Sequence, residues 1–409
     1  MIARDNLKAA WKKVRANRGV DGLGIEASRG LIRTQWKEIE ARLLVGTYQA
    51  QPVKRVEIPK PGGGVRKLGV PTVFDRFIQQ AALQVLVPLF EPGFSEHSYG
   101  FRPGRSAHQA VQAAREHQRG GRQWVVDIDL ASFFDEVNHD LLMARVRRRV
   151  KDARMLKLIR AFLQSGAMLG GLVQPTDKGT PQGGPLSPLL SNILLDDLDK
   201  ELERRGHRFC RYADDCNIYV GSRRGGERVM DSTVRFLEER MKLKVNRGKS
   251  AVERSYKRVF LGYSFMVFSP PKLRVPEKSC QKMRDKLRER FRRGRGHRIE
   301  DIIEHELNPL LRGWIAYFRL SETTSFAGEL DRWIRRRLRC VIWRQWKSPR
   351  TRYKRLRRLG LKEDLARRPV WNGRGPWHNS GSLAMSVSLP PRTFAAMGLI
   401  SLLASPHIS

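Results

Sequence analysis

The stretch that decides the fold runs from Phe209 to Val220 and reads FCRYADDCNIYV. Two short runs of β-forming residues flank the adjacent acids Asp214 and Asp215, so the pattern predicts a β-hairpin with carboxylates at its tip. Because side chains alternate between the two faces of a strand, we expect one of these acids to face the chemistry. Mg²⁺ keeps its waters and needs charge from several oxygens, so a second acid has to come from elsewhere in the chain.

The run WVVDIDL, residues 124–130, is the best candidate for that second source. In a strand, its inner apolar residues would point into a core, while Asp127 and Asp129 would share the opposite face. Carboxylates from two adjacent strands can hold two Mg²⁺ about 4 Å apart, which activates a 3′-hydroxyl and stabilises a leaving pyrophosphate. The predicted reaction is therefore nucleotidyl transfer. A Tyr-x-Asp-Asp tetrapeptide on its own is most often an ordinary polar turn, so the rest of the chain has to decide.

Composition restricts the class of partner. The chain has 409 residues, with 79 Lys and Arg against 41 Asp and Glu, which gives a formal net charge of +38. This excess points to a polyanion, with nucleic acid as the leading candidate. No apolar run approaches the roughly 18 residues of a spanning helix, and no apolar signal segment follows Met1, so we expect no membrane partner. The four cysteines lack zinc-site spacing, so we expect reduced, mostly buried thiols.

Three loops have compositions that suit contact with nucleotides or nucleic acid. In the first, two β-forming runs joined by PGGG predict a hairpin over residues 53–70, with Lys60 and Arg66 placed to close on a triphosphate. A solvated basic turn fits the same residues equally well. In the second, SYGFRPGRS, Arg102 and Arg105 suit a nucleic-acid backbone. The third, GTPQGGPL at residues 179–186, leads into a helix capped by Ser187 and suits either a nucleotide or a packing turn.

The rest of the chain is predicted to be largely helical, apart from a strand over residues 259–265. Apolar spacing predicts helices in residues 1–48 and 71–90 and from about residue 276 onward, with a new start at Asn308. Residues 331–358 contain 13 Lys and Arg and one acid. We expect Arg335, Arg336 and Arg339 on the exposed face of a helix there. A charged face is usually only solvated, but a run of one sign repels itself without a polyanion, which favours RNA.

Taken together and in this order, these motifs resemble the reverse transcriptases encoded by bacterial group II introns. Basic helices containing LRGW (311–314) and RWIRRRL (332–338) are similar to the thumb, or maturase, domain of that family, which grips the intron RNA. The motifs that carry the resemblance are IPKPGGG (58–64), SYGFRP (98–103), Asp129 with FFD (133–135), GTPQGGPLSP (179–188), YADD (212–215) and FLGY (260–263).

The resemblance implies an α+β right-hand polymerase with fingers, a palm built on an antiparallel sheet, and an α-helical thumb. It divides the chain into a basic helical extension (1–48), fingers and palm (49–270), and thumb or maturase domain (271–409). It also assigns the catalytic residues, since family spacing selects Asp129 over Asp127, which becomes a supporting residue. Asp129, Asp214 and Asp215 would bind two Mg²⁺. The incoming nucleotide would contact Lys60, Arg66, Phe134 under its sugar, Gln182, and Lys249 near the leaving phosphates.

The implied function is an RNA-directed DNA polymerase and maturase that binds its group II intron RNA, assists splicing and copies the RNA at a DNA target. Its partners would be that RNA, a DNA primer and dNTPs, in a bacterial cytoplasm near the nucleoid. Residues 16–22 are shorter than the family's usual segment, and no endonuclease domain with paired cysteines follows the thumb. We therefore expect no cleavage of the second DNA strand.

Two alternatives stay open, as does the oligomeric state. One is a related reverse transcriptase with a host role in phage defence, diversification or DNA repair. The other is an RNA-binding splicing factor without polymerase activity, which the intact acids Asp129, Asp214 and Asp215 argue against.

Overall fold

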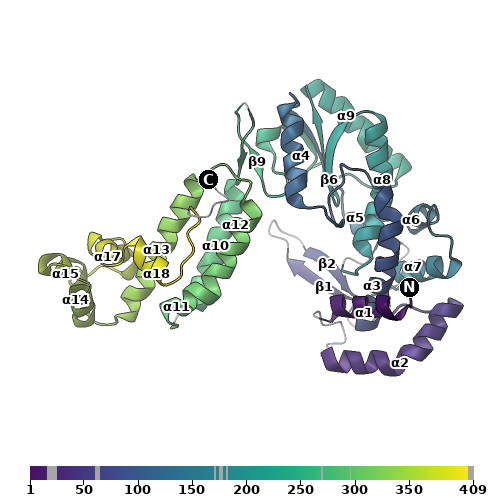
Figure 1. The fold of residues 1–409 in the computed structure, drawn as a ribbon. Helices are drawn as coiled ribbons and strands as arrows, with labels where there is room; N and C mark the ends of the chain where they lie inside the picture. The colour runs from purple at the N-terminus through teal and green to yellow at the C-terminus, as the bar shows by residue number, and fades with distance from the viewer. Residues whose placement is uncertain are drawn as a thin grey trace. The chain divides into compact units, whose positions relative to one another are not determined.

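The computed structural model describes residues 1–15, 25–59, 65–169, 172–174, 178–180, 183–268, 270–294 and 296–403. The chain forms two compact units, Met1–Ser255 and Tyr256–Ser409. Each unit has its own apolar core. The first combines two four-stranded sheets with helices and the second is mainly helical, which confirms the predicted α+β class (Figure 1).

The central sheet of the first unit contains the hairpin that the sequence predicted. Its strands are β3 (Trp124–Ile128), β6 (Arg208–Tyr212), β7 (Asp215–Val220) and β8 (Ala251–Arg254), in the antiparallel order β6-β7-β3-β8. Tyr212 pairs with Asp215, so Ala213 and Asp214 form the turn. The core-facing side of residues 124–130 is as predicted, since Val126 and Ile128 are buried, and Val125 on the opposite face is buried as well.

Helices cover both faces of this sheet. Helix α8 (Ser187–Arg204) packs against β6, and α9 (Arg223–Arg235) lies on the same face, where Gly226 leaves room for the side chain of Val252. Helix α4 (Ala107–Arg119) covers the other face and places His117 beside Tyr219. The N-cap predicted for α8 is one residue off, because Leu186 occupies that position and Ser187 is already helical.

The second sheet of this unit begins with the other predicted hairpin, β1 (Val53–Pro59) and β2 (Val65–Val70). Its order is β2-β1-β4-β5, and the three-residue strands β4 (Ala167–Leu169) and β5 (Leu172–Gln174) are too short for alternation to have revealed them. The remaining helices of the unit, several of which were predicted, are α1 (Arg4–Val14), α2 (Ile25–Val45), α3 (Val73–Phe90), η1 (Glu91–Gly93), α5 (Phe133–Glu136), α6 (His139–Val146), α7 (Ala153–Gln164) and η2 (Phe236–Arg240).

The second unit is built around three long helices, α10 (Glu277–Arg293), α12 (Asn308–Phe318) and α13 (Ser325–Gln345). Asn308 and Pro309 start α12 as predicted. The prediction of a strand over residues 259–265 is wrong for most of its length. Leu261 and Gly262 have positive φ angles of 49° and 78°, so the chain turns there, and only β9 (Ser264–Phe265) is extended.

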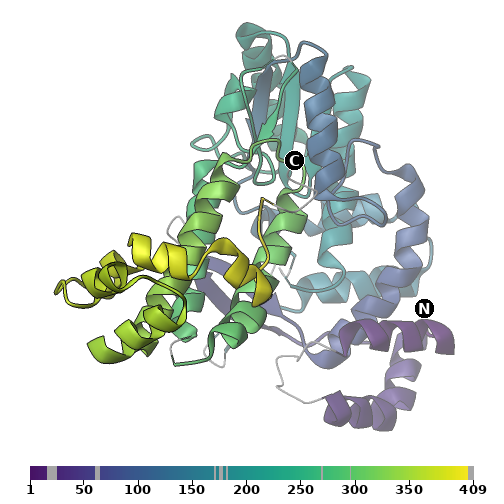
Figure 2. The same cartoon turned by 60° about the vertical axis from the view of Figure 1, so that its left-hand side comes forward.

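The C-terminal segment packs back on this helical unit (Figure 2). The Asp331 carboxylate on α13 accepts hydrogen bonds from the Leu402 amide and the Ser401 hydroxyl. The other elements of the unit are η3 (Ser255–Lys257) at its start, β10 (Leu273–Arg274), α11 (Ile299–Asp301), η4 (Ile302–Leu307), α14 (Pro349–Arg358), α15 (Glu363–Val370), α16 (Pro376–Ser380), α17 (Leu383–Ser388) and α18 (Pro391–Ala396).

Two further predictions concern the cysteines and membrane-spanning helices. All four cysteines are buried free thiols, as predicted. Within the described part of the chain, no helix combines the length and the apolar character needed to cross a bilayer.

Candidate active site and nucleic-acid interface

Four carboxylates gather where β3 and β7 meet the hairpin turn. In the register of these strands, Asp127 lies opposite Asn217 and Ile128 lies opposite Cys216. Asp215 is two residues from Asn217, so it shares the face of Asp127. Asp129 follows directly after β3, and Asp214 lies in the turn itself. The structure therefore brings together the acids that the two sequence motifs supplied.

The acids of this cluster repel one another. Although Asp215 keeps contact with solvent, desolvation by surrounding protein atoms raises the pKa of its carboxyl to about 6, with added contributions from Asp214, Asp127 and Asp129. Close like charges disfavour the ionised form, and a cation bound among them would relieve that cost. Lys249 lies beside the cluster, with its Nζ atom 3.9 Å from Asp129 Oδ2.

Backbone hydrogen bonds fix the position of Asp129. Its amide donates to the Ser250 hydroxyl at 3.0 Å, and its carbonyl accepts from the Asn246 amide at 2.8 Å. Both partners belong to the segment that carries Lys249, so this segment holds the lysine and the aspartate side by side. The expected turn after a helix at Lys249 is confirmed.

The carboxylates fit a hard cation by their chemistry. Mg²⁺ prefers oxygen ligands and is usually held by one or two carboxylates together with waters and substrate phosphates. In the described residues, no group of three or more His, Cys, Asp or Glu side chains forms a ready-made metal cage. The carboxylates are ligands of the kind that Mg²⁺ uses when waters and substrate phosphates complete its coordination.

The structure describes some of the predicted nucleotide-binding residues and not others. Phe134 lies on α5 and is partly buried, with its ring 5.2 Å from that of Phe133. Its carbonyl accepts a hydrogen bond of 2.6 Å from the Thr180 amide, so the loop that leads to Gln182 is anchored beside it. Lys60 and Gln182 lie outside the described residues, and of Arg66 only the backbone, in β2, is described.

The two arginines of the loop 98–106 differ in their surroundings. Arg102 is buried, donates to Glu91 and to the Ser98 carbonyl, and so stabilises its own loop. A guanidinium so enclosed is not available to a phosphate, which argues against the predicted nucleic-acid contact of Arg102. Arg105 pairs with Glu96 and keeps about a quarter of its side chain exposed, so its contact with RNA stays a prediction.

The three arginines predicted on the exposed face of α13 are not fully exposed. Arg336 stacks on the Trp377 ring at 4.1 Å, and Arg339 donates to the Leu389 carbonyl at 3.1 Å. Arg335 lies 3.9 Å from Asp331 on its own helix. Helical spacing correctly placed these residues away from the apolar core of the unit. Residues 376–389, however, pack on the face of α13 that carries Arg336 and Arg339. Their role in RNA binding stays a prediction.

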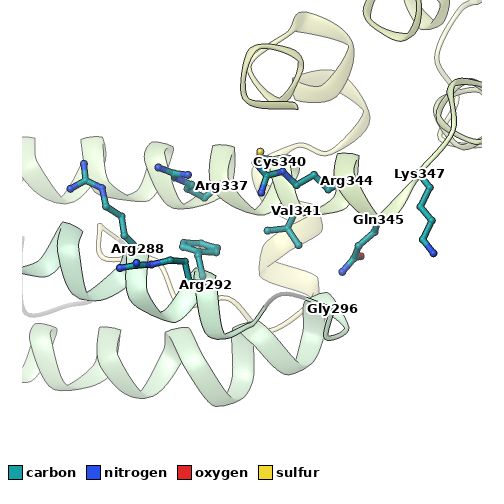
Figure 3. A pocket seen from close by; sticks show the side chains of 10 residues that line it. Arg288, Arg292, Gly296, Arg337, Cys340, Val341, Arg344, Gln345 and Lys347 are labelled. Carbon is teal, nitrogen blue, oxygen red and sulfur yellow. The ribbon is translucent and has the colours of Figure 1, made fainter. Parts of the chain in front are cut away.

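A basic groove that the sequence analysis missed lies between α10 and α13 (Figure 3). Its volume is about 850 Å³, and its lining includes no acidic residue. Arg292, Arg344 and Lys347 are exposed. The signal in the sequence was the spacing of Arg288 and Arg292, one turn apart on α10. The lining residues are Arg288, Phe291, Arg292, Gly296, Arg337, Cys340, Val341, Arg344, Gln345 and Lys347.

Comparison with known proteins identifies the family. Residues 58–265 match the reverse transcriptase (RNA-dependent DNA polymerase) family model. The chain belongs to the reverse transcriptase family. Residues 280–360 match the maturase-specific domain of group II introns, so this reverse transcriptase is of the group II intron type, as the motifs indicated. The acidic cluster lies in the first matched segment, and the basic groove lies in the second.

Similar proteins include two from bacteria. Protein YkfC of Escherichia coli is 34% identical over 273 residues, which cover 57% of this chain and 71% of that protein. The group II intron-encoded protein LtrA of Lactococcus lactis is 37% identical over 203 residues, 49% of this chain and 34% of LtrA. This reverse transcriptase therefore matches only about a third of LtrA. A solved chain of a partial Cas6-RT-Cas1–Cas2 complex is 27% identical, covers 58% of this chain and 42% of that chain, and has a TM-score of 0.38.

Proposed function

We propose that this protein is an RNA-directed DNA polymerase that also binds a group II intron RNA, assists its splicing and copies it at a DNA target. The observation that carries the proposal is the convergence of Asp127, Asp129, Asp214 and Asp215 at one end of the central sheet. A cluster of acids is otherwise unexpected in a chain with a net charge of +38.

The acidic cluster would hold the catalytic metal ions. Asp129 and Asp214 would bind two Mg²⁺, Asp215 would complete the set, and Asp127 would support Asp129 from the same face of β3. When bound, such ions lower the pKa of an attacking 3′-hydroxyl and neutralise charge on the leaving pyrophosphate. The backbone hydrogen bonds at Asp129 keep its carboxylate in place before substrate arrives.

The remaining predicted residues would orient the nucleotide. Lys249, adjacent to Asp129, would attract the phosphates that leave, and Lys60 and Arg66 would contact the triphosphate. Phe134 would lie under the sugar and exclude a 2′-hydroxyl, and Gln182 would lie along the nucleotide. The hydrogen bond from the Thr180 amide to the Phe134 carbonyl would support Phe134 in this position.

The groove between α10 and α13 would contact the phosphates of the intron RNA. Arg292, Arg344 and Lys347 offer charge on its rim, and the partly exposed Val341 offers apolar surface against which a base or sugar can rest. Counterion release from such contacts supplies affinity that does not depend on sequence. Arg105, Arg335, Arg336 and Arg339 would contribute where they remain accessible.

Primer extension on an RNA template tests the proposal. We expect the wild type to extend a DNA primer with dNTPs and Mg²⁺, and Asp214→Asn to lose at least about a hundredfold in rate. Intron RNA binding should be retained in that variant, because the RNA-binding charge lies elsewhere. Asp231→Asn, at an exposed aspartate on α9, is the matched control and should extend normally. Wild-type rates in Asp214→Asn would exclude this metal site.

A splicing assay tests the second half of the proposal. The purified protein should accelerate splicing of a group II intron RNA, and Asp214→Asn should do so equally well. Polymerase activity without any effect on splicing would favour the alternative of a reverse transcriptase with a host role.

A further inference from the structure

An ion pair lies completely buried next to the acidic turn. Arg211 on β6 and Asp199 on α8 are each 0% exposed. Arg211 Nε donates to Asp199 Oδ1 at 2.7 Å, and Nη2 donates to Asp199 Oδ2 at 2.6 Å. This bidentate arrangement fixes the plane of the guanidinium.

The same guanidinium uses all of its remaining N–H groups. Nη2 donates to the Ser98 hydroxyl at 2.8 Å, and Nη1 donates to Asn192 Oδ1 at 3.0 Å and to the Ala213 carbonyl at 2.8 Å. A guanidinium has five N–H donors, and here each has an acceptor. Arg211 therefore has one well-defined orientation.

The hydrogen bond to Ala213 matters because of where that residue lies. Ala213 has a φ angle of +58°, a left-handed conformation that an L-residue adopts only at an energetic cost. Its carbonyl belongs to the peptide group whose nitrogen is that of Asp214. By fixing this oxygen, Arg211 fixes the plane of that peptide and hence the direction in which the Asp214 side chain leaves the turn.

The turn is also held from its other side. A Cβ atom on Gly100 would lie 2.3 Å from the Ala213 nitrogen, so the backbone of Gly100 packs directly against the turn. The Gly100 carbonyl accepts from Asn192 Nδ2 at 2.8 Å, and the Tyr99 amide donates to the Arg211 carbonyl at 2.9 Å. Arg211 and residues 98–100 thus enclose Ala213 between them.

We propose that Arg211 is a positioning residue for the metal-binding carboxylates, and that Asp199 and Asn192 hold its guanidinium in the orientation this requires. The proposal rests on the proposed polymerase function, but Arg211 itself touches neither substrate nor metal. A buried ion pair is weak evidence for stability, because well-packed apolar residues often replace one at no cost. An apolar pair could not donate a hydrogen bond to the Ala213 carbonyl, so it could not fix the Ala213–Asp214 peptide as Arg211 does.

The decisive variant replaces both charges at once. In Arg211→Met/Asp199→Leu, neither residue leaves an unpaired buried charge, so the fold should survive. The melting temperature should fall, because the Ala213 carbonyl and Asn192 Oδ1 lose their buried donor, and the Mn²⁺ affinity of the folded protein, measured by calorimetry without substrate, should weaken about tenfold. The primer-extension rate should fall by about tenfold to a hundredfold, as for a displacement near 1 Å. The Mg²⁺ concentration for half-maximal rate should rise.

A matched control separates positioning from the general effect of losing an ion pair on α8. Arg145 on α6 lies 2.8 Å from Asp197 on α8, and its other hydrogen bond goes to the Leu141 carbonyl rather than to the hairpin. Arg145→Met/Asp197→Leu should leave both Mn²⁺ affinity and extension rate unchanged.

Each outcome decides the proposal. Wild-type Mn²⁺ affinity in the Arg211→Met/Asp199→Leu variant would overturn it, as would a rate that falls only in proportion to the folded fraction. If that variant does not fold, Arg211→Lys keeps a positive charge beside Asp199 without the planar fork, and its Mn²⁺ affinity decides in the same way. If the wild type does not extend primers, the polymerase proposal fails, while Mn²⁺ binding still reports whether Arg211 positions the acids.

Discussion

The Thr180 amide donates a hydrogen bond of 2.6 Å to the Phe134 carbonyl. The residue before it, Gly179, has a φ angle of +97°, and a Cβ atom there would lie 3.0 Å from the carbonyl oxygens of Phe134 and Asp135. The bond joins α5, which follows the acidic strand β3, to the loop that leads to Gln182. Two motifs that lie far apart in the sequence are therefore connected directly through their backbones.

Gly179→Ala should disturb this connection. The positive φ angle alone costs an alanine about 1 kcal/mol, and the contact with two carbonyl oxygens should displace the loop as well. We expect a higher KM for dNTPs with a smaller change in kcat, measured by steady-state primer extension. Gly206→Ala is the control, because Gly206 has a φ angle of +72° and open space around it. An equal rise in KM in both variants would mean that loop displacement is not the cause.

Phe134→Ala should weaken discrimination against ribonucleotides. In the proposed site the ring would exclude a 2′-hydroxyl, so its removal should raise ribonucleotide incorporation by about tenfold or more, which corresponds to about 1.4 kcal/mol. Use of deoxynucleotides should fall less. Competition between rNTPs and dNTPs on one template measures both, and unchanged discrimination would place the sugar gate at another residue.

Replacement of Arg292, Arg344 and Lys347 by Gln should weaken RNA binding and flatten its salt dependence. Each phosphate contact contributes about 0.7–0.9 to the log-log slope, so the loss of three should lower the slope by about 2–3. Splicing should fall more than extension of a short primer at low salt. Filter binding at several salt concentrations measures the slope, and the melting temperature should not change because all three side chains are exposed.

The corresponding variant at Arg335, Arg336 and Arg339 distinguishes the two surfaces. Arg336 and Arg339 hold residues 376–389 on α13, so their replacement by Gln should lower the melting temperature. If this variant flattens the salt slope and the groove variant does not, the RNA contact lies on the face that the sequence indicated.

Acid should destabilise the first unit through His117. Burial, and then the charge of His97, lower the pKa of His117 from 6.5 to about 4. The folded state therefore binds fewer protons than the unfolded state between these values, and its stability falls as the pH falls through that window. The melting temperature of the wild type should decrease from pH 6.5 to pH 4, and His117→Phe should remove part of that decrease. Identical pH profiles in the two proteins would contradict this assignment.

The sequence by itself determined the parts of this protein that depend on local pattern. The hairpin over 209–220, the buried Val126 and Ile128 of β3, and the start of α12 at Asn308 follow from period-two alternation and from a proline in the first helical turn, which involve residues close in the chain. The order of the motifs then indicated the family, because their combination is far more specific than any one of them. The short strands β4 and β5 gave no comparable signal, since three residues are too few to establish a period.

Only the tertiary structure decided what each polar side chain meets. Arg211 looks in the sequence like any basic residue on a strand, and it is the packing of α8 that encloses it with Asp199. Helical spacing places Arg336 away from the core, yet it cannot reveal that Trp377 returns to cover it. The groove between α10 and α13 likewise exists only once two helices pack together. A side chain's face is set by its neighbours in the chain, whereas its burial and its partners are set by segments brought to it from far along the sequence.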